Sequence, residues 1–144
     1  MTAFAATGGI GARNPAARRG SVKQGNAICA GYNKQVRGLS QEFFPPVRSV
    51  KRPPPPSVSK FQAFLRRLVP LTEAELHKLR ALKKPKADTA TIDAIYAEVG
   101  KGLVTLRLAQ TDHALARRLE GGTNPFAAAN KKARAYGLTV CGGS

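Results

Sequence analysis

The stretch SVSKFQAFLRRLVPLTEAELHKLRALKKP, residues 57–85, carries the strongest structural pattern in this chain. Its first half places large apolar side chains at i, i+3, i+4 and i+7, namely Phe61, Phe64, Leu65 and Leu68. This spacing predicts an amphipathic helix with Arg66 and Arg67 on its outer face. Because proline disfavours helical geometry in the residue before it, we expect Pro70 to end this helix.

A second helix is predicted to open at Thr72. Thr72-Glu73-Ala74-Glu75 has the form of a capping box, in which the Thr72 hydroxyl and the Glu75 carboxylate satisfy each other's backbone N–H groups. The acids lie in the first turn of this predicted helix and Lys and Arg follow them, which is the charge order that the helix dipole favours. The buried stripe would consist of Leu76, Leu79 and Leu82, and Pro85 would end the helix.

Helical spacing continues after residue 88. Ile92, Ile95, Tyr96 and Val99 predict a third helix that begins at about Asp88 or Thr89, and Gly100 and Gly102 weaken its continuation. Residues 103–108 fit either a helix or a short strand, and a helix is favoured because a lone strand would have no partner. Further helix starts are predicted at Thr111 or Asp112 and at Asn124-Pro125, with stops at Gly121-Gly122 and Gly137.

The first 58 residues differ from this pattern. Residues 1–60 carry a net charge of +9, with Glu42 as their single acid, and few side chains that could form a core. The run Pro53–Pro56 favours polyproline II, although a short helix or strand around residues 27–36 is allowed. The sequence therefore predicts a mostly α protein: a long, extended, Pro/Gly-rich basic arm (1–58), a small body of three to five short helices (59–137), and a tail (138–144) that forms an edge strand or a loop.

The charge indicates the kind of partner. A net charge of +16 and a pI near 10.8 favour a polyanion such as RNA or DNA, contacted through its phosphates. No pattern for base-specific recognition is present. A single basic cluster is most simply explained as a surface in contact with water. Several such clusters occur in this chain, and together they favour binding to a polyanion. The candidate nucleic-acid-binding residues are Arg13, Arg18, Arg19, Lys23, Arg48, Lys51, Arg52, Arg66, Arg67, Lys83, Lys84, Lys86, Arg117, Arg118, Lys131, Lys132 and Arg134.

A second set of residues is expected to contact protein. Adjacent aromatic rings before prolines are more often packing anchors than base-stacking platforms. The prolines read as a semi-rigid spacer, because their basic flanks do not match either orientation of an SH3 ligand. The candidate protein-docking residues are Phe43, Phe44, Pro53, Pro54, Pro55 and Pro56.

Catalytic and metal-binding patterns are weak. The segment Gly8–Arg13 lacks the third glycine of a dinucleotide loop and the ending of a P-loop. A zinc site would need the scattered Cys29, Cys141, His77 and His113 to converge, and a disulfide between the two cysteines stays open. We therefore expect neither an enzyme nor a cofactor, metal or small-molecule substrate.

These features predict a structural protein of a large macromolecular assembly. A virion is favoured, with the chain as a minor capsid, cement or internal protein whose arm threads between subunits or contacts nucleic acid. The alternatives are a ribonucleoprotein subunit, such as an organellar ribosomal protein, and a free DNA- or RNA-binding regulator. The expected location is the virion, or an organellar or cytoplasmic ribonucleoprotein, since neither a secretory signal nor an apolar run long enough to span a membrane is recognisable.

Overall fold

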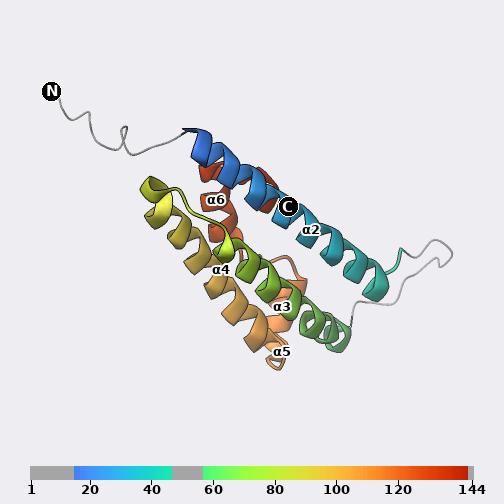
Figure 1. The fold of residues 1–144 in the computed structure, drawn as a ribbon. Coiled ribbons are helices and arrows are strands. Elements are labelled where there is room, and N and C mark those ends of the chain that lie inside the picture. Colours follow the sequence, from blue (N-terminus) through green and yellow to red (C-terminus); the bar gives the residue numbers. More distant parts are fainter. Residues whose placement is uncertain (1–14, 47–56, 143–144) are drawn as a thin grey trace.

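The computed structural model describes residues 15–46 and 57–142, and these residues form helices joined by short turns. The described parts contain no strand, so the prediction of a mostly helical protein is confirmed. Figure 1 shows α2, α3 and α4 as three long helices lying side by side, with α6 across one side of them. The elements are α2 (Pro15–Phe43), α3 (Val58–Ala81), the 3-10 turn η2 (Lys86–Asp88), α4 (Thr89–Ala109), α5 (His113–Glu120), α6 (Ala127–Tyr136) and α7 (Thr139–Gly142).

The prediction of an extended arm is wrong for residues 15–43, which form α2 and pack on α3 and α7. The physical reason is a heptad spacing along α2, with steps of three and four residues. Each position of that series is buried or partly buried: Arg18, Val22, Gly25, Cys29, Tyr32, Val36, Leu39 and Phe43. Residues 15–43 therefore belong to the helical body. The rest of the predicted arm, residues 1–14 and 47–56 with Pro53–Pro56, lies outside the described residues.

The two helices predicted on either side of Pro70 are one helix. Pro70 lies inside α3 and is exposed, while Val69 and Thr72 on the opposite face are buried. A proline in a helix interior costs about 3 kcal/mol, and tertiary burial of the neighbouring turns offsets this cost here. The predicted capping box is also wrong, because the Thr72 hydroxyl donates to the Leu68 carbonyl oxygen within the helix.

Several helix boundaries agree with the sequence pattern. Helix α4 continues through Gly100 and Gly102, so residues 103–108 are helical as favoured. Asp112 caps α5 by accepting a hydrogen bond from the backbone N–H of Leu115 at 2.9 Å. Gly137 ends α6 with a φ of 109°, a left-handed conformation suited to glycine.

Two predictions about the C-terminal part need correction. Asn124 caps a turn before α6, accepting from the Phe126 N–H, and the helix itself begins at Ala127. The tail was predicted as a strand or loop, yet residues 139–142 form the short helix α7. It packs against α2, and Cys141 in α7 forms a disulfide with Cys29 in α2, whose Cα atoms lie 5.1 Å apart.

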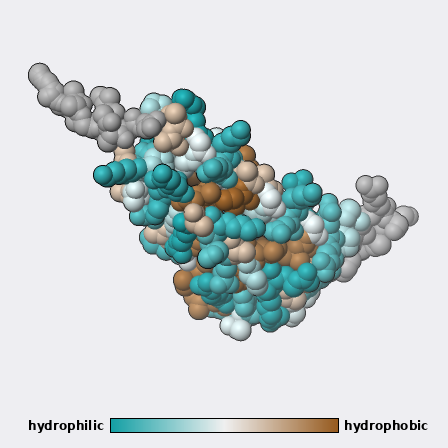
Figure 2. Space-filling view, in the orientation of Figure 1, coloured by the Kyte–Doolittle hydropathy of each residue, from teal (hydrophilic) through white to brown (hydrophobic). Residues whose placement is uncertain are grey.

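One hydrophobic core joins α2 to the other helices. Cys29 and Leu39 of α2 belong to the same buried cluster as Leu65, Leu79, Ile95 and Leu103. In Figure 2 the visible face is largely hydrophilic, and apolar atoms reach the surface along the line between α2 and α3. Within the described ranges, no helix combines the length and apolar character needed to span a membrane.

Two glycines of α4 give a matched test of this packing. A Cβ added at Gly102 would collide with the Phe126 ring, whereas one added at Gly100 would meet no atom within 4 Å. We expect Gly102→Ala to lower the free energy of unfolding by about 1–3 kcal/mol through overpacking. Gly100→Ala should raise it by about 0.5–1 kcal/mol through better helix propensity. Urea denaturation would measure both, and equal effects would argue against the Gly102–Phe126 contact.

Candidate anion-binding surface

The structure divides the predicted phosphate-binding residues into three groups. Arg13, Arg48, Lys51 and Arg52 lie outside the described residues. Arg18, Arg66, Arg67, Lys84, Lys132 and Arg134 bond to other groups of the chain. The remaining seven are exposed, and their side chains make no ion pair or hydrogen bond with any described residue: Arg19, Lys23, Lys83, Lys86, Arg117, Arg118 and Lys131.

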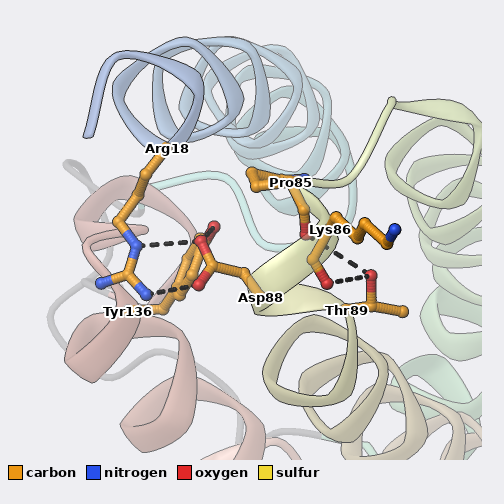
Figure 3. Close-up of polar contacts among 6 residues, drawn as sticks. All are labelled: Arg18, Pro85, Lys86, Asp88, Thr89 and Tyr136. Atoms are coloured by element: carbon orange, nitrogen blue, oxygen red, sulfur yellow. Dashed lines mark hydrogen bonds and ion pairs between the residues drawn. The ribbon is translucent and has the colours of Figure 1, made fainter. Parts of the chain in front are cut away.

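Arg18 has a structural role. Its Nη2 and Nε atoms bind the two carboxylate oxygens of Asp88 at 2.7 and 3.0 Å. Figure 3 shows the side chains of Arg18 from α2 and Tyr136 from α6 meeting at Asp88, and the Tyr136 hydroxyl donates to Asp88 at 2.8 Å. The guanidinium also lies over the Tyr136 ring. This cluster ties α2, η2 and α6 together, so Arg18 is not a free phosphate contact.

The electrostatics of this cluster follow from its hydrogen bonds and from burial. The hydrogen bond with Asp88 raises the pKa of Arg18, so the guanidinium stays charged. Burial, together with the hydrogen bond to Asp88, raises the pKa of Tyr136 to about 12, so the phenol stays a donor at neutral pH. Asp88 thus receives hydrogen bonds from a charged guanidinium and from a neutral phenol.

The other bonded cations lie at the surface. Arg67 pairs with Glu42 at 3.3 Å, Lys84 with Asp93 at 2.6 Å and Lys132 with Glu98 at 3.3 Å. Arg66 donates to the Gln110 carbonyl oxygen and Arg134 to that of Gly142. Exposed pairs of this kind contribute about 0–1 kcal/mol each, so an external anion could compete for these side chains.

Four cations align on one face of α2. Arg19, Lys23, Lys34 and Arg37 are all exposed, and none bonds to another described residue. At 100° per residue their side chains fall within a sector of about 60°, and they extend along about 27 Å of the helix. Residues 15–41 contain no acid that could neutralise them. We call these four residues the α2 stripe.

Sequence reasoning missed half of the α2 stripe. Lys34 and Arg37 were not among the candidates, because their spacing from Arg19 and Lys23 has meaning only on a helix. Recognising the heptad series that buries Cys29 and Leu39 would have identified the helix and, with it, the stripe.

The candidate docking rings pack within the chain. Phe43 and Phe44 lie with their ring centroids 5.9 and 5.5 Å from that of Phe64 in α3. Lys60 lies over the Phe44 ring, which is 38% exposed. This aromatic cluster joins the end of α2 to the start of α3, and only Phe44 presents a substantial surface to a partner.

The structure also shows where the cysteines and histidines considered as zinc ligands lie. The disulfide joins Cys29 to Cys141, so neither carries a thiolate for a metal. His77 and His113 are exposed on α3 and α5. Over the described ranges, no three His, Cys, Asp or Glu side chains come together in a group that could hold a metal ion.

Comparison of the chain with protein-family models, with curated proteins and with solved structures gives no match. The function is therefore inferred from features of this chain. The two features that say most about its function are the α2 stripe and the disulfide.

Proposed function

We propose that this protein is a structural component of a large assembly in an oxidising environment, such as a virion or a cell envelope, and that it docks on a polyanion. The observation that carries the proposal is the α2 stripe. Its four unpaired cations lie on one exposed helix face, and the opposite face of the same helix is anchored in the core through Cys29 and Leu39. Because the helix backbone that carries these charges is already ordered, binding would have to order only their side chains.

The charge of the whole chain supports this proposal. A net charge of +16 attracts polyanions over distances longer than a direct contact. Four phosphate contacts would give a slope of about −3.6 in a plot of log affinity against log salt concentration on duplex DNA. Exposed residues outside the stripe, including Lys83, Lys86, Arg117 and Arg118, would add a weaker and less ordered attraction.

The disulfide supports an oxidising location. Structural disulfides persist in secreted proteins, in bacterial envelopes and on virion or cell surfaces, while cytosolic and nuclear thiols are kept reduced. Cys29 is 2% exposed and is joined to a residue 112 positions away. A bridge of this kind favours the virion or envelope reading over a ribonucleoprotein subunit or a cytosolic regulator.

The test compares two quadruple variants with the same change in net charge. In one, the stripe residues Arg19, Lys23, Lys34 and Arg37 become Gln. In the other, Lys83, Lys86, Arg117 and Arg118 become Gln. Each variant loses two Arg and two Lys, and circular dichroism would check that both are folded.

Binding to a labelled 24-bp duplex would be measured by fluorescence anisotropy at several salt concentrations. We expect the stripe variant to lose most of the wild-type affinity and to reduce the salt slope by about 3 to 4. The second variant should lose less affinity and retain most of the slope. Equal losses in both variants would show that only net charge matters, and a strong preference for one duplex sequence would favour a regulator.

A further inference from the structure

A cavity of about 430 Å³ lies among α2, α3, α4 and α6, apart from the α2 stripe except at Arg37. This volume is within the range of small-molecule sites in proteins. Its wall is mainly apolar and includes the rings of Tyr32, Tyr96 and Phe126. Arg37 and Asn124 are exposed and also line the cavity, so it reaches the surface beside them.

Most polar groups of the wall already have partners within the chain. The Tyr32 hydroxyl is hydrogen-bonded to the Thr72 hydroxyl at 2.8 Å, and the Tyr96 hydroxyl donates to the Leu79 carbonyl oxygen at 2.9 Å. The Asn124 side chain accepts from the Phe126 N–H. Each of these side chains therefore has a partner in the chain without a ligand.

Glu75 is the one acid that lines the cavity, and its side chain, like those of Arg37 and Asn130, has no such partner among the described residues. Its side chain lines the cavity, is partly buried, and makes no hydrogen bond or ion pair with any residue in the ranges 15–46 and 57–142. Burial raises the pKa of Glu75 to about 8. Because Pro70 does not interrupt α3, Glu75 faces α2 from the middle of a helix instead of capping a helix start.

An ammonium group is the strongest complement to such a carboxyl. Partial burial without a partner disfavours the ionised carboxylate, and a bound cation would favour it again. Aromatic rings beside a cation add cation–π attraction, and Tyr32 and Tyr96 line the same cavity as Glu75. A neutral hydrogen-bond acceptor would gain only one bond from the protonated acid.

We propose that this cavity binds a small amine with an aromatic ring, whose ammonium group pairs with Glu75 while the ring lies against the apolar wall. The proposal goes beyond polyanion docking and departs from the expectation that the chain has no small-molecule ligand. It depends on neither the α2 stripe nor an external assembly.

Three indole probes of similar size test the charge requirement: tryptamine, its neutral analogue tryptophol, and the anion indole-3-propionate. The protein contains no Trp, so probe fluorescence can be followed without an indole background. At pH 8.5 we expect tryptamine to bind at least tenfold more tightly than tryptophol, and indole-3-propionate to bind weakest. Equal affinity for tryptamine and tryptophol, or no binding of tryptamine, would overturn the proposal.

Two matched variants assign the charge preference to one residue. Glu75→Gln should reduce the affinity for tryptamine to that for tryptophol, while leaving the affinity for tryptophol unchanged. Glu73→Gln removes the same charge two residues away, from an exposed side chain paired with Arg107, and should retain the preference. If Glu75→Gln keeps the preference for tryptamine, Glu75 is not the partner of the ammonium group.

The pH profile gives a readout that a merely structural Glu75 would not produce. Because Glu75 must ionise to pair with the amine, the affinity for tryptamine should fall as the pH drops below about 8, and the affinity for tryptophol should stay level. The other titratable groups that line the space around Glu75 are Tyr32 and Arg37 of α2, Lys78 of α3 and Tyr96 of α4. Burial raises the pKa of both tyrosines, which moves their titration further above pH 8. A level profile for tryptamine would contradict the proposal.

Discussion

Reduction of the Cys29–Cys141 disulfide is expected to lower the free energy of unfolding by about 4–5 kcal/mol. The bridge joins residues 112 positions apart, so it closes almost the whole described chain and removes much of the conformational freedom of the unfolded state. It also ties α2 to α7, the last helix. Urea denaturation of the wild-type protein with and without a reductant would measure the effect.

Comparing reduction with substitution separates the contribution of the cross-link to stability from that of side-chain packing. Reduced wild-type protein keeps both sulfur atoms, whereas Cys29→Ala also removes the sulfur of a residue that is 2% exposed in the core. Cys29→Ala should therefore destabilise the protein somewhat more than reduction does. A change below about 1 kcal/mol on reduction would contradict the role assigned to this bridge.

Arg18→Met is expected to lower the free energy of unfolding by about 3 kcal/mol, because it leaves the Asp88 carboxylate buried without its cation. The Asp88 side chain is 5% exposed and that of Arg18 is 38% exposed, so removing Arg18 takes the guanidinium away from the more deeply buried partner. Because Arg18 is partly hydrated in the native protein, the effect should lie at the lower end of the range for buried pairs. Chemical denaturation would measure it.

Arg67→Met is the matched control. Arg67 pairs with Glu42 at the surface, where both side chains are 57% exposed, and its removal should lower the free energy of unfolding by less than about 1 kcal/mol. In the double variant Arg18→Met/Asp88→Asn, part of the lost stability should return because no buried charge is left. Equal effects of Arg18→Met and Arg67→Met would show that Asp88 does not depend on Arg18.

The body of the fold could be predicted where local signals agree with packing. In α4, a helical apolar spacing identified the helix despite Gly100 and Gly102, and Asp112 and Gly137 marked ends that the structure confirms. These signals are local, so tertiary structure was not needed to interpret them.

Helix α2 was missed because composition and periodicity disagree within it. Gly20, Gly25, Gly31 and Gly38 lower its intrinsic helix propensity by about 1 kcal/mol each. Gly25 nevertheless occupies a buried heptad position, where an added Cβ would lie 2.7 Å from the Leu138 side chain. Gly25 thus weakens the helix locally but allows α2 to approach the C-terminal segment. This stabilising effect depends on tertiary packing, so the local sequence does not reveal it.

The cavity could not be predicted for a related reason. Thr72 and Glu75 match a capping box in sequence, and this interpretation requires a helix start after Pro70. Once burial carries α3 through Pro70, the same two side chains turn toward α2, where Thr72 meets Tyr32 and Glu75 lines the cavity. A long-range packing effect therefore decides what these residues do.

The most direct test of this account is amide hydrogen exchange across residues 15–43 in the isolated, oxidised protein. If α2 is an integral helix held by the core and the disulfide, amides around Cys29 and Leu39 should exchange about as slowly as those in the middle of α3 and α4. Exchange of this segment at the rate of an unstructured chain, while α3 and α4 stay protected, would contradict the account.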